Sequence, residues 1–350
     1  MNRFVRSAIA KMTGYVPGEQ PGQAKFIKLN TNENPFPPSP KALEAIRQAA
    51  GDSLARYPDP AAMAFRLVLA DRYGISPDSI LCGNGSDDIL TICTRAFVAE
   101  SDLIRFPYPS YTLYHTLAEI QGARSESVPF EKDGSLGDVF TEPASSLKLV
   151  FVPNPNSPTG TWISPPQILK MAQQLPCPLV VDEAYADFAG ESCISLISQS
   201  EKLLVTRTLS KSYALAGLRF GYVVGHPNMI AELAKVKDTY NCDALSIAGA
   251  TAAISDQPWL EENTRQVISN RAALSASLVT LGFDVLPSSA NFVWCRHESK
   301  PAKQIYEALK ERGLLVRYLE FPNWGDGLRI SVGTESQQQV LFQLLSEILV

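Results

Sequence analysis

Residues 207–222 read RTLSKSYALAGLRFGY, and the two ends of this stretch belong to short apolar runs, KLLVTRTL and FGYVVG. Both runs are predicted strands. Lys211 falls in the polar turn after the first run, and Arg219 comes eight residues later, after a mostly apolar segment. The stretch therefore places an amine and a guanidinium between two strands.

The same alternation of patterns extends outward from this stretch. SILCG, SDLIRF, KLVFVP and PLVVDEA are further predicted strands, and helical patterns such as DDILTICTRAFVA and PPQILKMAQQL lie between them. Residues 39–52 predict a helix, with Ser39 as its cap and Pro40 at its first position. Alternation of this kind predicts an α/β fold with a mainly parallel sheet and helices on both faces. Ligands of such sheets bind at the carboxyl ends of the strands.

The pattern changes at both ends of this region, so we expect three parts. Residues 41–245 form the large domain, and residues 246–350 predict a smaller α+β domain, with a long helical region followed by NFVWCR and LRISVG as strands. Residues 1–40 are rich in Pro, Asn and Gly and predict an extended arm that packs with the small domain.

Composition excludes several classes of protein. The chain has 350 residues, 45% hydrophobic and 19% charged, with a net charge of −5, which fits a soluble globular protein and not a nucleic-acid-binding one. No apolar stretch approaches the ~20 residues of a membrane helix, and the N-terminus lacks the apolar core of a signal peptide. We therefore expect a cytoplasmic location. Six scattered cysteines and three histidines predict neither a metal site nor a disulfide framework.

Two further stretches place polar residues at predicted strand ends. In LCGNGSDDIL, Gly83 and Gly85 permit positive φ, and Ser86 with the first amides of a helix suits a phosphate, although an ordinary capped helix fits too. In VDEAYADF, Asp182 ends a buried strand, where a carboxylate must be solvated, paired with a cation, or used as a cap.

Together these residues have the chemistry that pyridoxal 5'-phosphate requires. Desolvation and a nearby cation lower the pKa of a lysine, which makes the amine of Lys211 available to an aldehyde. The carboxylate of Asp182 holds the pyridine nitrogen protonated, while the glycine turn, Thr208 and Ser210 hold the phosphate. Taken alone, Lys211 would be interpreted as a surface lysine in a polar loop.

At the level of motifs, the chain resembles the class II aminotransferases, which are pyridoxal-phosphate enzymes of the aspartate-aminotransferase-like fold (fold type I), and among them the histidinol-phosphate aminotransferases. Eight stretches occur in the family's order: LNTNENPFPPSP, RYPDP, NGSDD, FPYPSY, NPNSPTG, VDEAYADF, RTLSKSYALAGLRFGY and LRISVGT. The resemblance covers nearly the whole chain.

The resemblance implies a role for each motif residue. Lys211 is the catalytic lysine that binds the aldehyde and moves the proton. The residues implied to bind the cofactor are Gly85, Ser86, Asp87, Tyr111, Asn156, Asp182, Tyr185, Thr208, Ser210, Arg219 and, from the other subunit of a homodimer, Tyr57. The residues implied to bind the substrate are Arg329, which meets its anionic group, with Arg317 and Tyr15 as helpers.

One motif departs from the family pattern, which often reads N-P-N-N-P-T-G. Ser157 stands where the second asparagine contacts the cofactor ring, and Asn156 precedes it. We expect Asn156 to make the contact, because an amide reaches farther and donates better than a hydroxyl. A weaker contact from Ser157 is the alternative.

The resemblance further implies transamination between histidinol phosphate and 2-oxoglutarate, giving imidazole acetol phosphate and glutamate, in histidine biosynthesis. An aromatic amino acid aminotransferase is one alternative, since Tyr15, Phe321 and Trp324 suit an imidazole or a phenyl ring. A pyridoxal-phosphate decarboxylase such as threonine-phosphate decarboxylase is another, since it shares these motifs. A non-catalytic binding module is the third.

Overall fold

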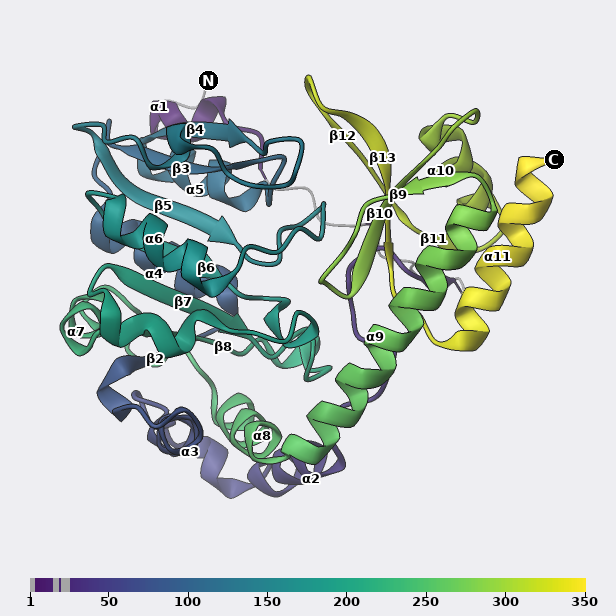
Figure 1. The fold of residues 1–350 in the computed structure, drawn as a ribbon. Helices are drawn as coiled ribbons and strands as arrows, with labels where there is room; N and C mark the ends of the chain where they lie inside the picture. Colours follow the sequence, from purple (N-terminus) through teal and green to yellow (C-terminus); the bar gives the residue numbers. More distant parts are fainter. Residues whose placement is uncertain (1–3, 15–18, 20–25) are drawn as a thin grey trace.

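The computed structural model describes residues 4–14, 19 and 26–350. These residues form two lobes, and the long helix α9 (Gln257–Thr280) runs from the bottom of the larger lobe to the smaller one (Figure 1). Two sheets form the centres of the lobes, so each lobe is described in turn.

The large lobe is built on a seven-stranded sheet with the order β2-β8-β7-β6-β5-β3-β4. The strands are β2 (Ile80–Gly83), β3 (Leu103–Tyr108), β4 (Arg124–Pro129), β5 (Leu147–Pro153), β6 (Leu179–Asp182), β7 (Leu203–Thr208) and β8 (Gly221–Gly225). Only β8 runs against its neighbours in this sheet, because both of its pairings are antiparallel and the other pairings are parallel. The carboxyl ends of β3, β5, β6 and β7 therefore meet at one edge.

Helices cover both faces of this sheet. One face packs with α3 (Met63–Tyr73), α6 (Pro165–Gln174) and α8 (Ala244–Ser255), and the other with α4 (Ser86–Phe97), α5 (Leu113–Gln121) and α7 (Pro227–Ala234). Successive strand residues alternate between the two cores: Val205 belongs to the first and Leu204 to the second. Burial on both faces explains why these strands read as continuous apolar runs.

Local sequence signals mark the start of α2 and the end of α3. Helix α2 (Pro40–Ala49) begins with proline, and the Ser39 hydroxyl accepts a hydrogen bond from the Lys41 amide at 3.2 Å. Helix α3 ends at Gly74, which has φ +63°. The strand β4 was not predicted, because its sequence RSESVP is polar and lies at the sheet edge, where little of it is buried.

The small lobe is built on a four-stranded antiparallel sheet with the order β12-β13-β10-β9. Its strands are β9 (Phe283–Val285), β10 (Phe292–His297), β12 (Arg317–Phe321) and β13 (Gly325–Ser331). Helices α9, α10 (Ala302–Glu311) and α11 (Glu335–Leu349) enclose its apolar core. These elements are those of an α+β unit.

The arm and the helical region after residue 245 touch both lobes. The short helix α1 (Ser7–Lys11) lies against α5, whereas β1 (Ile27–Lys28) pairs with β11 (Leu314–Leu315) of the small lobe. Helix α8 packs in the core of the large lobe, and α9 enters the small-lobe core from Val267 onward. The division at residues 40 and 245 stays a prediction. In the described part of the chain, no helix combines the length and apolarity needed to cross a membrane.

Candidate active site

The carboxyl edge of the large sheet gathers the residues that the sequence singled out. Asp182 ends β6, Thr208 ends β7, and Lys211 follows three residues later. Tyr111 and Asn156 lie in the loops that follow β3 and β5. Parallel pairing of β3, β5, β6 and β7 brings these four chain segments to one place.

A turn at the start of α4 forms a cradle for an anion. Gly85 has φ +86°, and a Cβ built on it would lie 2.6 Å from Nη2 of Arg219. A Cβ on Gly221 would lie 2.6 Å from the backbone nitrogen of Ser86. Only glycine allows these approaches, so the guanidinium and the first amides of α4 converge on one point, as a phosphate requires.

Two hydroxyls extend this cradle. The Thr208 hydroxyl lies 3.0 Å from the Ser210 hydroxyl, and the Ser210 amide donates to Thr208 Oγ1 at 3.2 Å. Arg219 Nη1 donates to Ser210 Oγ at 3.4 Å, and Arg219 Nη2 lies 3.9 Å from Oδ2 of Asp87. The structure thus brings Thr208, Ser210, Arg219 and Asp87 together around the turn.

Asp182 is a buried carboxylate that faces neutral donors. Its Oδ2 accepts from the Tyr114 hydroxyl at 2.8 Å, and its Oδ1 accepts from the Ala184 amide at 3.3 Å and from the Thr206 hydroxyl at 3.4 Å. Burial raises the pKa of Asp182 to about 6, although the hydrogen bond from Tyr114 opposes this rise. Among the described residues, Asp182 forms no ion pair. A cation that the chain does not supply therefore fits here, and a protonated pyridine nitrogen is such a cation.

Tyr114 is a site residue that was not predicted from the sequence. Its ring is fully buried, stacks on Phe151 at 4.8 Å and meets the edge of Tyr111 at 5.7 Å. Burial beside Asp182 raises the pKa of Tyr114 well above its usual range, so the hydroxyl remains a hydrogen-bond donor. The available signal was the spacing alone: Tyr114 comes three residues after Tyr111, which lies in the loop that leads into α5.

Lys211 faces the arm and Tyr185. Its Nζ donates to the Thr31 carbonyl at 3.2 Å and lies 5.7 Å from the centre of the Tyr185 ring. The Asn34 side chain donates to the backbone carbonyls of Lys211 and Ser212 at 3.0 and 3.1 Å. The lysine is therefore held at its backbone, while its amine rests against a carbonyl that a reacting group can replace.

The contacts of the NPNSPTG turn favour Ser157 over Asn156 as the residue facing the site. Asn156 is fully buried, and its amide nitrogen donates to the Pro109 carbonyl at 3.1 Å and to the Thr159 hydroxyl at 2.8 Å. Both amide hydrogens are thus used inside the protein, against the expectation that Asn156 serves the ring. The Ser157 hydroxyl instead accepts from Arg329 Nη1 at 3.0 Å.

Arg329 lies on β13 with Arg317 directly opposite on β12. Directly opposed residues of an antiparallel pair share a face, so both guanidinium groups lie on one side of the small sheet. Arg329 Nη2 donates to the Asn30 carbonyl at 3.0 Å, and its Cζ lies 5.5 Å from the Phe292 ring centre. The structure thus places the two arginines opposite each other on neighbouring strands.

Two predicted residues lie apart from this cluster. The side chain of Tyr57 is 80% exposed and stacks on Tyr240 with ring centres 4.4 Å apart, so within one chain it meets none of the residues above. Tyr15 lies outside the described residues.

The aromatic residues proposed for the pocket lie in the β12–β13 hairpin. Trp324 and Phe321 pack against Trp294, with ring centres 5.0 and 6.2 Å from it. The Tyr108 hydroxyl donates to the Pro322 carbonyl at 2.7 Å, which joins the end of β3 to this hairpin. The hairpin therefore reaches the large lobe next to the loop that carries Tyr111.

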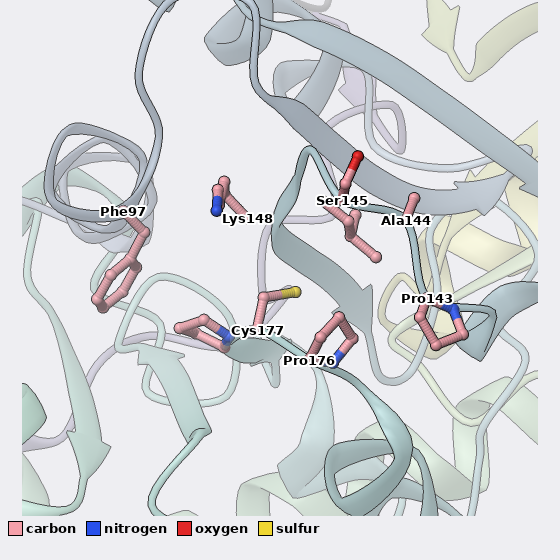
Figure 2. Close-up of a pocket in the computed structure, with 9 residues that line it drawn as sticks. Phe97, Pro143, Ala144, Ser145, Lys148, Pro176 and Cys177 are labelled. Atoms are coloured by element: carbon pink, nitrogen blue, oxygen red, sulfur yellow. The ribbon is translucent and has the colours of Figure 1, made fainter.

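A surface cavity of about 440 Å³ lies elsewhere, at the opposite ends of the strands. Figure 2 shows its lining, with Lys148 and Cys177 among Pro143 and Pro176. Leu147 and Lys148 are the first two residues of β5, and Cys177 precedes β6, so the cavity opens at the amino edge of the sheet. None of its lining residues belongs to the cluster at the carboxyl edge.

Comparison with known proteins agrees with this site. The family model for aminotransferase class I and II matches residues 24–345. Histidinol-phosphate aminotransferase of Rhodopirellula baltica is 56% identical over 333 residues, which cover 95% of this chain and 92% of that protein. The crystal structure of histidinol-phosphate aminotransferase from Sinorhizobium meliloti in complex with pyridoxal-5'-phosphate has a TM-score of 0.90 at 29% identity, covering 100% of this chain and 98% of that one.

The fold and the lysine and carboxylate at its carboxyl edge define an enzyme with the aspartate-aminotransferase-like fold. The chain belongs to the aminotransferase class I and II family. The predicted fold and the predicted enzyme class are thus confirmed. L-threonine-O-3-phosphate decarboxylase from Porphyromonas gingivalis matches with a TM-score of 0.80 at 22% identity, covering 92% of this chain and 99% of that one. That likeness concerns the fold alone, so the fold does not separate transamination from decarboxylation.

Proposed function

We propose that the chain transfers the amino group of histidinol phosphate to 2-oxoglutarate with pyridoxal phosphate as its cofactor. The main structural support for this cofactor is the buried Asp182 carboxylate. It has no cationic partner among the described residues, and it lies at the same carboxyl edge as Lys211. The identity of the amine rests on the family and on the relatives of that name.

When bound, pyridoxal phosphate supplies an aldehyde that condenses with amines and a ring that accepts electrons from the substrate Cα. The first amides of α4, Ser86 and Arg219 bind its phosphate, with Thr208 and Ser210. Asp182 holds a proton at the pyridine nitrogen, because a buried carboxylate stabilises a cation beside it.

Lys211 acts twice in the proposed reaction. Its Nζ would hold the aldehyde in the resting enzyme, and when free it would accept the proton that leaves the substrate Cα. Release from the Thr31 carbonyl, 3.2 Å away, gives the amine this freedom. Tyr185 lies beside it and donates its hydroxyl hydrogen to the ring oxygen.

Arg329 binds the anionic end of the substrate. Histidinol phosphate carries a phosphate ester where an amino acid carries its α-carboxylate, and a dianion suits two guanidinium groups on one face of a sheet. Arg329 and Arg317 are such a pair. The phosphate takes the place of the Asn30 carbonyl and the Ser157 hydroxyl as partner of Arg329.

One assay tests the reaction against its rivals. Purified protein is incubated with histidinol phosphate, phenylalanine or threonine phosphate in parallel, each with pyridoxal phosphate and 2-oxoglutarate, and the keto product, glutamate and CO₂ are measured. We expect glutamate and a keto product with histidinol phosphate at the highest kcat/KM. Preference for phenylalanine would assign an aromatic aminotransferase, and CO₂ from threonine phosphate would assign a decarboxylase.

We further propose that the enzyme is a homodimer in which Tyr57 reaches the cofactor phosphate of the other subunit. Tyr57 is 80% exposed and stacks on the exposed Tyr240, and the exposed Leu54 and Met63 lie close to it in the sequence. An apolar surface next to an exposed tyrosine suits a subunit interface. The cytoplasmic location remains a prediction, which cell fractionation tests.

A further inference from the structure

Three consecutive residues of the arm contact three of the functional side chains. The Asn30 carbonyl accepts from Arg329, the Thr31 carbonyl accepts from Lys211, and the Asn32 side chain donates to the Tyr185 hydroxyl at 2.9 Å. The substrate arginine, the lysine and the ring tyrosine are thus held by one short segment. Of its three residues, only Asn32 makes its contact through a side chain.

Asn32 is buried and makes hydrogen bonds through both its backbone and its side chain. It is 1% exposed and has φ +54°, a left-handed conformation that asparagine tolerates better than most residues. Its amide donates to the Ser331 hydroxyl at 2.8 Å, and its carbonyl accepts from the Asn291 side chain at 3.0 Å. Ser331 lies two residues after Arg329 on β13, so Asn32 joins that strand to Tyr185.

The orientation of the Asn32 amide follows from Ser331. The Ser331 hydroxyl accepts from the Asn32 backbone and donates to the Asn32 side-chain oxygen at 3.1 Å. With the amide turned over, Ser331 would face two donors and its own hydrogen would lose its acceptor, which is costly at 3% exposure. The side-chain nitrogen therefore points at Tyr185, and the Tyr185 oxygen is an acceptor.

A hydroxyl that accepts one hydrogen bond has its hydrogen left for another partner. Among the described residues, no acceptor of the Tyr185 hydrogen is found. We propose that Asn32 is a positioning residue, which turns the Tyr185 hydroxyl hydrogen toward the ring oxygen of the cofactor and ties that hydroxyl to the strand of Arg329. This inference rests on the proposed function, since it assumes that the cofactor ring lies at Tyr185.

The substitution Asn32→Asp replaces the hydrogen-bond donor that faces Tyr185 with an acceptor and keeps the shape of the side chain. Aspartate tolerates positive φ and still accepts from Ser331, but its carboxylate cannot donate to Tyr185. The tyrosine hydrogen then turns to this carboxylate and away from the ring oxygen. A ring oxygen without its donor is more basic, so the proton it shares with the lysine-bound nitrogen is held to higher pH.

The measurement is the pH midpoint of the visible absorbance of protein reconstituted with pyridoxal phosphate. We expect Asn32→Asp to raise the midpoint by about one pH unit, the equivalent of one charge-assisted hydrogen bond. The new negative charge also raises the midpoint, so the same change is made in the Tyr185→Phe background, where only the charge acts. A clearly smaller rise in that background supports the inference, and equal rises in both overturn it.

Asn32→Gly is the second variant, because glycine keeps the positive φ without any charge. Its midpoint should fall between those of the unchanged protein and Tyr185→Phe, whereas an unchanged midpoint contradicts the positioning role. Thermal unfolding confirms that each variant is folded. Protein without substitutions that shows no visible band with pyridoxal phosphate would refute the proposed function itself, and with it this inference. If the band is normal and its pH midpoint does not change in the Asn32 variants, the inference is refuted but the proposed function is not.

Discussion

The two halves of the site are held in different ways. The proposed cofactor half consists of Asp182, Thr208, Ser210 and Lys211, which lie at or just after the ends of two neighbouring strands of one sheet. The proposed substrate half centres on Arg329, which contacts Ser157 of the large lobe and Asn30 of the arm.

The positions of the residues in the cofactor half follow from the ends of adjacent strands, whereas the position of Arg329 depends on its contacts with the large lobe and the arm. Changes in the cofactor half should therefore destroy the chemistry, and changes in the substrate half should weaken substrate binding first.

The largest effect is expected from Lys211→Ala. Loss of the amine removes both the group that binds the aldehyde and the base that moves the proton, and each role is worth orders of magnitude in rate. We expect turnover to fall by roughly 10⁴-fold or more and the visible absorbance of the bound cofactor to disappear. Steady-state assays and absorbance spectra measure the two losses.

The matched control is Lys235→Ala at the C-cap of α7, where the amine is exposed and pairs with Glu232 of that helix. This variant should keep its rate and its spectrum. Near-normal activity of Lys211→Ala would refute the assignment of the catalytic lysine.

The opposite pattern is expected from Arg329→Gln. Glutamine is polar but uncharged and too short to replace both guanidinium nitrogens, so it cannot meet a phosphate dianion with charge, and a lost charge-assisted hydrogen bond costs about 1.5–3 kcal/mol. KM for histidinol phosphate should rise, and kcat/KM should fall by about 10- to 100-fold. The visible absorbance should stay as it is, because the cofactor half is intact.

Arg312→Gln is the control, because this small-lobe arginine is exposed and, within the described residues, bonds only to the Ala308 carbonyl of α10. Its kinetics should match those of the unchanged protein. A loss of bound cofactor in Arg329→Gln would show that the two halves are not separable in this way.

The same difference decides how far the sequence predicts the site. Lys211, Asp182 and the glycine turn could be found because each follows an apolar run, and strands of a parallel sheet end together. Arg329 and Arg317 came only from the family motifs, since their contact depends on the register of β12 with β13. Their pairing depends on the tertiary structure and cannot be predicted from a local sequence pattern.

Two other residues show what kind of information was absent. Asn156 looked suited to the ring by residue type, yet the fold uses both of its amide hydrogens within the loops. Asn32 lay in the motif LNTNENPFPPSP without a visible role, because its partners Tyr185 and Ser331 are distant in the chain. Hydrogen-bond saturation and long-range partners are properties of the folded protein only.

Burial of the Asp182 carboxylate should destabilise the folded protein without cofactor, and Asp182→Asn should remove this desolvation cost. Burial raises the pKa of Asp182 from 3.8 to about 6, so the folded protein without cofactor binds this proton more tightly than the unfolded chain. Its stability therefore falls as pH rises from about 4 to about 6, by up to ~3 kcal/mol from this group. At pH 7 the Asn variant without cofactor should be more stable than the unchanged protein, and at pH 4 the two should be equal.

Urea unfolding at the two pH values measures this difference. Asp71→Asn, at an exposed position of α3, is the control and should give no such pH-dependent gain. Pyridoxal phosphate should reverse the order, because asparagine cannot hold a protonated pyridine nitrogen. Equal stability of Asp182→Asn and the unchanged protein at pH 7 would mean that the carboxylate is not penalised by burial.

The smallest effect is expected from Tyr57→Phe, which asks whether the cofactor half is complete in one chain. Phenylalanine keeps the stacking on Tyr240, seen at 4.4 Å, and removes only the hydroxyl. One lost hydrogen bond to a phosphate costs about 1.5 kcal/mol, so the Kd of pyridoxal phosphate should rise roughly tenfold while the dimer mass stays the same. Fluorescence titration and sedimentation measure the two quantities, with Tyr306→Phe on α10 as a hydroxyl control. An unchanged Kd, or a fully active monomer, would place the whole cofactor half within one subunit.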